Sequence, residues 1–254
     1  MTQVGEAIKN ALPDLEAIRR RSAEIAGTCQ EHGEYTRGES ARAEGQCPKC
    51  WASVKAQHEI RRRMARFCQE AGVPKRFSGY SLEDFEPPTA SAKKVSAFMY
   101  KFSEDFHAHY EAGRSIVMAG RTGTGKTMLA CATGLHIAIE HGRSCRYTTA
   151  YHIVRDIKDT YGGEGSEKEI VRGFVSPDLL IVDEVGVQYG TDAERLLMFE
   201  VLNGRYEAMK PTIVISNLEL KGIGDYLGDR VMDRLRENGG AVLVFDWGSH
   251  RVKK

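Results

Sequence analysis

A glycine-rich segment that ends in lysine and threonine carries the clearest chemistry in this sequence. Residues 120–127 read GRTGTGKT and match the phosphate-loop pattern G-x-x-x-x-G-K-[ST]. An apolar run at 115–119 precedes it and a helical pattern at 128–140 follows it. A strand, a turn and a helix N-terminus in this order aim several backbone N–H groups at one anion. We therefore predict a nucleoside triphosphate site rather than an ordinary tight turn.

The lysine and the threonine have separate predicted roles in that site. Lys126 should reach the β- and γ-phosphates, and the Thr127 hydroxyl should bind Mg2+. The glycines allow the backbone to approach the phosphates closely. The residues expected to contact the nucleotide are Gly120, Arg121, Thr122, Gly123, Thr124, Gly125, Lys126, Thr127 and Met128.

Two carboxylates follow an apolar run later in the chain. The run LLIV at 179–182 is typical of a buried parallel strand, and Asp183 and Glu184 come directly after it. We expect Asp183 to hold the magnesium ion through water. Glu184 should orient or deprotonate the attacking water, unless it is a capping or solvent-exposed carboxylate. ATP is the expected nucleotide because the N-K-x-D motif of GTPases does not follow.

Further polar residues near the end of the sequence could complete the site. Asn217 follows the apolar run 212–216 and could sense the γ-phosphate, although Asn is also a common turn residue. Arg230 and Arg234 are four residues apart and share one helix face. Such arginines in P-loop domains commonly act as fingers on a neighbouring subunit's nucleotide; surface salt bridges with nearby Asp and Glu are the alternative. Arg251 is a further candidate for phosphate sensing.

A second kind of site is indicated by cysteine spacing. Cys29 and His32 form a C-x2-H pair, and Cys47 and Cys50 form a C-x2-C pair after 14 intervening residues. Two such knuckles predict a structural zinc site with tetrahedral Cys3His ligation. The intervening segment has almost no apolar residues, so the metal would supply most of its folding free energy. Unconnected thiols, or Cys68 in place of His32, are the alternatives.

Composition limits the kind of protein this chain can be. The 254 residues are 41% hydrophobic and 28% charged, with a net charge of +1. A nearly neutral chain gives no bulk electrostatic reason to bind nucleic acid, so any such surface must be local. No apolar run approaches the roughly 18 residues that span a bilayer, and residues 1–10 lack a secretory signal. We expect a cytoplasmic protein with reduced thiols and no membrane partner.

Alternating strand and helix patterns predict the fold. Five apolar runs alternate with helical patterns after residue 89, which indicates an α/β fold with a parallel sheet covered by helices on both faces. We predict a helical, zinc-binding N-terminal domain at 1–75, a linker at 76–88 and an ATPase domain at 89–254. The predicted helices are 4–26, 52–71, 91–112, 126–140, 150–161, 167–175, 191–209 and 225–237. The predicted strands are 115–119, 144–148, 179–182, 212–216 and 241–245.

These motifs together resemble the DnaC-type replicative helicase loaders, which are AAA+ ATPases of bacteria and phages. The resemblance extends over residues 77–251. Besides the phosphate loop it rests on LIVDEVGVQ at 180–188, GDRVMDR at 228–234 and FDWGSHR at 245–251. The last two segments are much more specific than the first. The chain ends soon after the final predicted strand, with no room for the C-terminal helical lid of many AAA+ proteins, and this family also lacks that lid.

The resemblance implies an adaptor ATPase that places a hexameric replicative helicase on single-stranded DNA. Its N-terminal domain would bind the helicase, and its ATPase domains would associate with one another on it. By this similarity Arg230 and Arg234 look like the trans-acting pair, Arg251 like a second sensor, and Lys158 and Tyr161 like a DNA-facing element. Independently of the resemblance, an aromatic side chain beside a lysine can stack on bases and contact phosphate, but Tyr161 could also be a packing residue. Not every such loader has a cysteine cluster.

Other functions fit part of this pattern. Helper ATPases of insertion sequences resemble the ATPase domain closely and act on duplex DNA with a transposase, but they commonly lack such a zinc module. A non-catalytic adaptor with a purely structural ATP is less consistent with intact Lys126, Asp183 and Glu184. Metabolic P-loop kinases normally carry a substrate lid, which we do not find here.

Overall fold

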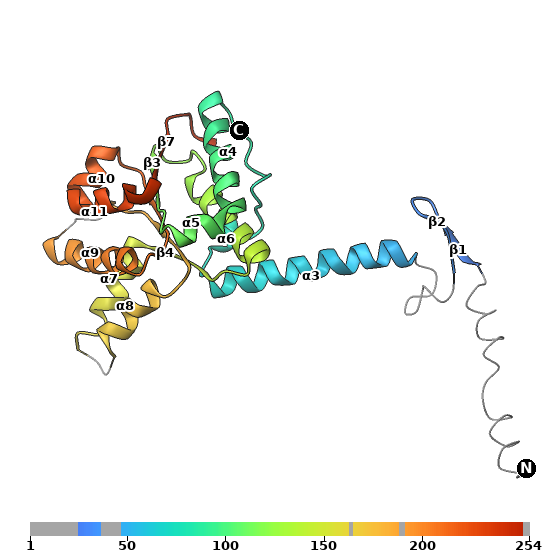
Figure 1. The fold of residues 1–254 in the computed structure, drawn as a ribbon, viewed down its shortest axis with the longest axis horizontal. Helices are drawn as coiled ribbons and strands as arrows, with labels where there is room; N and C mark the ends of the chain where they lie inside the picture. Colours follow the sequence, from blue (N-terminus) through green and yellow to red (C-terminus); the bar gives the residue numbers. More distant parts are fainter. Residues whose placement is uncertain (1–24, 37–46, 163–164, 188–190, 251–254) are drawn as a thin grey trace, which may run out of the picture. The chain divides into compact units, whose positions relative to one another are not determined.

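The computed structural model describes residues 25–36, 47–162, 165–187 and 191–250 (Figure 1). The chain forms two compact units, Met1–Arg62 and Arg63–Lys254. The division falls within α3 (Pro48–Glu70). None of the helices in these ranges is long and apolar enough to cross a membrane.

The first unit contains a short antiparallel hairpin. It consists of β1 (Ile25–Cys29) and β2 (Gly33–Thr36), with Cys29 opposite Gly33 across the turn. The predicted helix 4–26 is wrong at its end, because residues 25 and 26 begin β1; its remainder lies outside the described residues. The N-terminal region is therefore not purely helical. The hairpin bends the chain sharply, and Gly33 permits this with φ of +74°.

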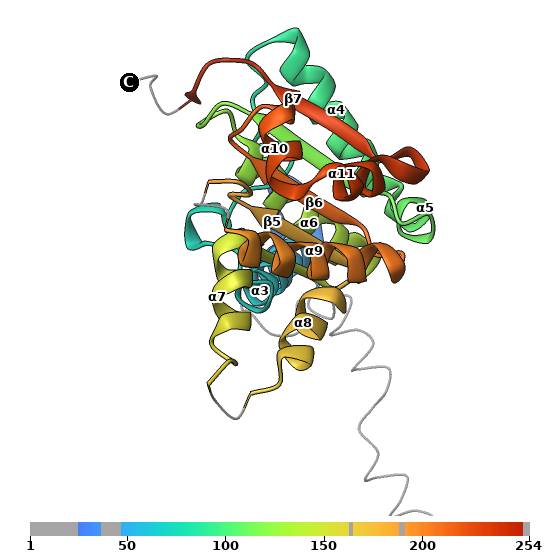
Figure 2. The same cartoon turned by 90° about the vertical axis from the view of Figure 1, so that its left-hand side faces the viewer.

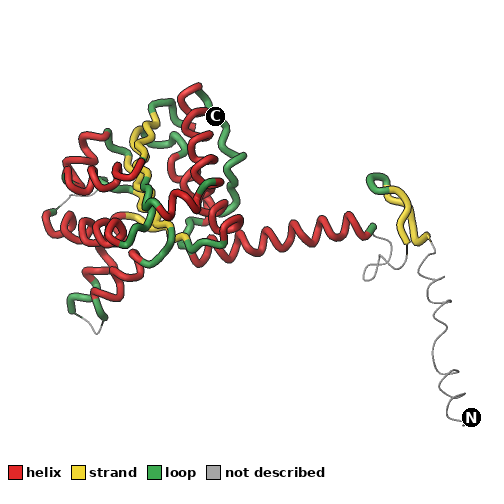
Figure 3. The backbone as a smooth tube through the Cα atoms, in the orientation of Figure 1, coloured by secondary structure: helices red, strands yellow, loops and turns green. Residues whose placement is uncertain are grey.

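The second unit is built on a five-stranded sheet in the order β4-β5-β6-β3-β7, with every neighbouring pair parallel. Strands β3, β5 and β6 are almost wholly buried, as expected for strands with helices on both faces (Figure 3). The strands are β3 (Ile116–Gly120), β4 (Cys145–Thr149), β5 (Leu179–Asp183), β6 (Thr212–Ser216) and β7 (Ala241–Phe245).

Two sets of helices cover the two faces of this sheet, and the alternation of strand side chains divides the core accordingly. Ile116 and Met118 pack with α4–α6, whereas Val117 and Ala119 pack with α7–α11. Figure 2 shows these helices around the sheet. The helices are α4 (Ala90–Glu104), α5 (Phe106–Glu111), α6 (Lys126–His141), α7 (Ala150–Lys158), α8 (Glu167–Val175), α9 (Asp192–Glu207), α10 (Leu220–Leu227) and α11 (Asp229–Arg236). Two 3-10 turns, η1 (Lys75–Phe77) and η2 (Glu237–Gly239), complete the elements.

The five strands lie close to their predicted positions, but two predicted helices are each divided into two. The predicted helix 91–112 is broken at Asp105 into α4 and α5. The predicted helix 225–237 is two helices that meet at Gly228, whose φ of +82° lies outside helical geometry. Helix α7 ends at Lys158, so the predicted end at residue 161 was too late.

Threonines fix where three of these helices begin. The side chains of Thr89 and Thr149 accept hydrogen bonds from backbone N–H groups in the first turns of α4 and α7. At α9, Thr191 and Glu194 form a reciprocal capping box. Thr149 is the last residue of β4, so the cap also starts α7 directly at the carboxyl edge of the sheet.

Candidate functional site

The phosphate loop joins β3 to α6, as the sequence predicted. Gly120, Gly123 and Gly125 have φ of +128°, +77° and +96°, a region in which side chains with a β-carbon are strained. A β-carbon on Gly120 would lie 2.3 Å from the Phe245 carbonyl oxygen on neighbouring β7. The curvature of the loop therefore requires all three glycines, and the adjacent strand also requires Gly120.

The segment after β7 forms hydrogen bonds with the phosphate loop. The Trp247 indole N–H donates to the Thr124 carbonyl at 3.0 Å, and the His250 backbone N–H donates to the Gly123 carbonyl at 2.9 Å. Trp247 is buried. Residues 245–250 therefore hold two carbonyl groups of the phosphate loop.

Lys126 lies under the loop and is only 4% exposed. Its ammonium group donates to the carbonyls of Gly120 and Arg121 at 2.6 Å each. A buried ammonium group is costly unless oxygen atoms surround it. Lys126 therefore places a positive charge at the centre of the loop.

Thr127 and Asp183, which are 56 residues apart in sequence, meet at the end of β5. The Thr127 hydroxyl donates to Asp183 Oδ2 at 2.7 Å, and the Glu184 backbone N–H donates to Asp183 Oδ1 at 2.7 Å. Asp183 is 7% exposed. A hydroxyl and a carboxylate oxygen beside a phosphate loop are the hard oxygen donors that Mg2+ prefers, so these residues fit the predicted metal.

A cavity of about 320 Å3 opens in front of these groups. Glu184 lies on its wall with φ of +59°, which is unusual for a residue other than glycine and marks local strain. Asn217 follows β6 and lies on the same wall. The residues around the cavity are Arg76, Phe77, Thr122, Gly123, Gly125, Lys126, Thr127, Met128, Asp183, Glu184 and Asn217.

Three residues of this site were not predicted from the sequence. Arg76 and Phe77, from η1, line the cavity, although both fall in the segment that we interpreted as a linker. Tyr147, from β4, donates its phenolic hydrogen to Asp183 Oδ2 at 3.0 Å. Burial, and then the charge of Asp183, raise the pKa of Tyr147 above its usual range, so the phenol keeps its proton and acts as the donor. No motif spacing connects these residues to the phosphate loop.

The two candidate finger arginines lie away from the cavity of their own chain. Both guanidinium groups are over the Phe199 ring, at 5.8 Å for Arg230 and 5.9 Å for Arg234. Arg234 also lies over Tyr206 at 4.8 Å and donates to the side-chain oxygen of Asn203. Arg230 is exposed, so it is accessible to a second molecule. Arg251 lies outside the described residues.

Of the two predicted DNA-facing residues, Lys158 is the last residue of α7 and Tyr161 lies in the turn that follows. Lys158 forms an ion pair with Glu194 at 3.3 Å, and Tyr161 is 61% exposed. Tyr161 is therefore not a packing residue. Its ring is available for contact with another molecule.

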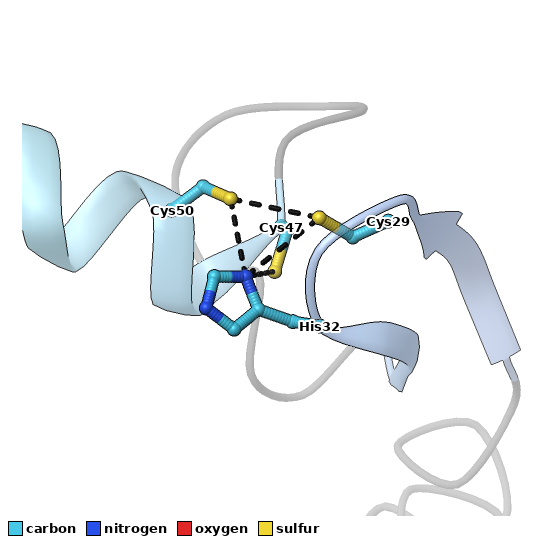
Figure 4. Close-up of side chains that lie close together, drawn as sticks. All are labelled: Cys29, His32, Cys47 and Cys50. Carbon is cyan, nitrogen blue, oxygen red and sulfur yellow. Dashed lines mark hydrogen bonds between the residues drawn. The ribbon is translucent and has the colours of Figure 1, made fainter.

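Cys29, His32, Cys47 and Cys50 form one cluster, as their spacing predicted (Figure 4). Cys29 and His32 come from the β1–β2 hairpin, Cys47 lies directly before α3, and Cys50 lies in the first turn of α3. Their ligand atoms all lie within 4.8 Å of one another. The Sγ atoms of Cys29 and Cys50 are 3.5 Å apart, and Cys50 Sγ is 3.3 Å from His32 Nδ1.

These distances fit a tetrahedral zinc site. Ligands at about 2.3 Å from a zinc ion are about 3.8 Å from one another in a tetrahedron. The backbone of Glu31, and then the His32 side chain, lower the pKa of Cys29 to about 6. The hydrogen bond with Cys29 raises the pKa of Cys50 to about 12.

Cys68 is not in the cluster. Its thiol donates a hydrogen bond to the Ser78 carbonyl, so His32 is the fourth clustered residue.

Comparison with known proteins identifies related sequences. The family profile described as "IstB-like ATP binding protein" matches residues 54–244. The replicative helicase loader DnaC of Buchnera aphidicola subsp. Schizaphis graminum is 29% identical over 191 residues, covering 74% of this chain and 76% of that protein. Escherichia coli K12 DnaC is 27% identical over 192 residues, covering 75% and 77%.

Solved structures match about two thirds of this chain. A crystal structure of the DnaC helicase loader has a TM-score of 0.61 at 23% identity, covering 68% of this chain and 99% of the other. A structure of DnaI has a TM-score of 0.57 at 20% identity, covering 68% and 94%. These likenesses show the fold, and the sequence matches confirm the resemblance to DnaC-type loaders. The chain belongs to the family of IstB-like ATP-binding proteins.

Proposed function

We propose that this protein is an ATP-hydrolysing loader that binds a hexameric replicative helicase and helps to place it on single-stranded DNA in the cytoplasm. The observation that carries the proposal is the convergence of the phosphate loop, the Thr127–Asp183 pair, Glu184 and Asn217 on one cavity. The relatives named as helicase loaders favour this task over that of a transposition helper.

The residues of the cavity have separate roles in ATP hydrolysis. The loop N–H groups and Lys126 bind the triphosphate, and Thr127 and Asp183 hold Mg2+, which neutralises charge on the phosphates when bound. Glu184 accepts a proton from water, and Asn217 orients that water or senses the γ-phosphate. Arg76 and Phe77 extend the binding surface beyond the loop.

A neighbouring copy of the protein on the helicase supplies the arginines that stabilise the transition state of hydrolysis. Arg230 and Arg234 are on α11, outside their own cavity, which favours action on the next subunit's ATP. Arg251 follows the segment that holds the phosphate loop and acts as a second sensor. The N-terminal domain, with zinc held by its Cys3His cluster, binds the helicase.

Complex formation with the helicase of the same host tests the proposal. The full chain and the hexameric helicase are mixed with and without ATP and an oligonucleotide, and the masses of the products are measured. We expect a complex of fixed stoichiometry that contains single-stranded DNA when ATP is present. Absence of any complex, together with tight binding to duplex DNA, would instead support the transposition helper.

Single-stranded DNA binding should depend on the exposed tyrosine. Tyr161→Ala is expected to weaken binding to an oligothymidylate roughly tenfold, because it removes a stacking surface beside Lys158, whereas Tyr161→Phe should bind normally. Tyr100→Ala removes another exposed tyrosine, on α4 at the opposite face of the sheet, and serves as control. Fluorescence anisotropy with ATP present measures the affinities. Equal affinities for all four proteins would contradict the DNA role of Tyr161.

A further inference from the structure

We infer that Tyr147 is a positioning residue for Asp183, and that its hydroxyl prepares this carboxylate to bind the magnesium ion of the nucleotide. The inference rests on the proposed Mg2+–ATP site. It concerns a residue on an edge strand, outside the phosphate loop and outside the acidic segment. Tyr147 is a second side chain, after Thr127, that donates a hydrogen bond to Asp183 at the end of β5.

The pairing of β4 with β5 brings the phenol to Asp183. Tyr147 lies opposite Ile181, and Thr149 lies opposite Asp183. Asp183 is thus the diagonal neighbour of Tyr147, two residues further along, a separation that a long aromatic side chain can span. The resulting hydrogen bond of 3.0 Å ends on Oδ2, the oxygen that also accepts from Thr127.

The tyrosine itself is held in place from both sides. Its backbone N–H donates to the Ala71 carbonyl at 2.6 Å, directly after α3 ends. Its ring packs against the hydrophobic core formed by α4–α6 and the sheet, together with Phe67. Because both backbone and ring are fixed, the hydroxyl has little freedom except to point at Asp183.

Three donors thereby define the orientation of the Asp183 carboxylate. Thr127 and Tyr147 donate to Oδ2, and the Glu184 backbone donates to Oδ1. Outer partners of this kind orient metal ligands, and their loss commonly lowers metal affinity by 10- to 100-fold. Thr127 is itself an expected metal ligand, so the phenol is the side-chain donor whose task is orientation alone.

Removal of the hydroxyl alone tests this role. Tyr147→Phe keeps the ring and its packing. The dissociation constant of a fluorescent ATP analogue is measured in EDTA and in excess Mg2+. The value in EDTA divided by the value in Mg2+ reports how strongly the metal supports binding. We expect this ratio to fall roughly tenfold in Tyr147→Phe, with binding in EDTA changed less than about twofold. The Mg2+ concentration at half-maximal turnover should rise correspondingly.

Tyr110→Phe is the matched control. Tyr110 is also a partly buried tyrosine packed against the same core, and its hydroxyl accepts a hydrogen bond from Lys210 away from the cavity. It should leave the Mg2+ dependence unchanged. In an Asp183→Asn background, Tyr147→Phe should have no further effect, because the hydroxyl acts through that carboxylate.

The outcomes separate this inference from the proposed function. If wild type binds ATP with support from Mg2+ and Tyr147→Phe behaves identically, Tyr147 is a packing residue and the inference fails. The inference also fails if the tyrosine change remains additive with Asp183→Asn. If the wild-type protein shows no ATP binding, or no support from Mg2+, the proposed nucleotide site fails first.

Discussion

Glu184→Gln is expected to lower ATP turnover by at least about a hundredfold while leaving the affinity for ATP nearly unchanged. Glutamine has the size of glutamate but cannot accept a proton from water. The side chain lies on the wall of the cavity, so its removal as a base acts on chemistry rather than on the fold. Its backbone conformation is strained in both proteins, because φ of +59° is disfavoured for either residue.

Turnover and binding must be measured separately for this variant. Phosphate release at saturating ATP gives kcat, and titration with a fluorescent ATP analogue gives the affinity. Glu111→Gln, an exposed position at the end of α5, is the matched control and should keep full turnover. Unchanged turnover in Glu184→Gln would support the adaptor hypothesis, in which bound ATP is only structural.

The same variant can locate the arginine fingers. Glu184→Gln and Arg234→Ala subunits should each be inactive alone on the helicase. In a mixture, the intact Glu184 of one subunit can meet the intact Arg234 of its neighbour, so part of the turnover should return. Recovery requires the arginine to act in trans. If Arg234 acted within its own chain, no mixture would recover activity.

Strands were predictable because their signal is local. The apolar run at 212–216 coincides with β6, since buried parallel strands need continuous apolar residues. The run at 241–245 coincides with β7, an edge strand of the sheet. Helix boundaries were harder. The pattern that predicts one helix at 225–237 continues through Gly228, where a positive φ separates α10 from α11. Periodicity identifies the buried face, but it does not register a change in helix direction.

In the site, too, residues within one motif were predictable from the sequence, whereas contacts that depend on the tertiary fold were not. The phosphate loop and the Cys3His cluster have fixed spacings, and the structure brings their residues together as predicted. Tyr147 reaches Asp183 only through the order of strands, with β4 beside β5. Arg76 and Phe77 reach the cavity through the turn after α3. A single sequence contains no spacing rule for such contacts.

Loss of one cysteine of the Cys3His cluster should unfold a different part of the protein. Cys50→Ser is expected to remove zinc from the purified protein and to unfold the β1–β2 hairpin, because two short strands have little core of their own. The four clustered side chains would fill all four positions of a tetrahedral zinc ion, which is typical of structural zinc. The metal should therefore contribute folding, with no open position for catalysis.

Metal content and local protection together test the zinc prediction. Elemental analysis should find one zinc per wild-type chain and almost none in Cys50→Ser. Hydrogen exchange of residues 25–36 should become fast in the variant, while ATP turnover without helicase stays normal, because the cavity belongs to the other compact unit. Cys68→Ser is the control, since that thiol contacts Ser78 outside the cluster and its loss should retain zinc. If Cys68→Ser lost the metal and Cys50→Ser kept it, the assigned ligand set would be wrong. If zinc loss slowed exchange at residues 25–36 or left it unchanged, the metal would have no folding role.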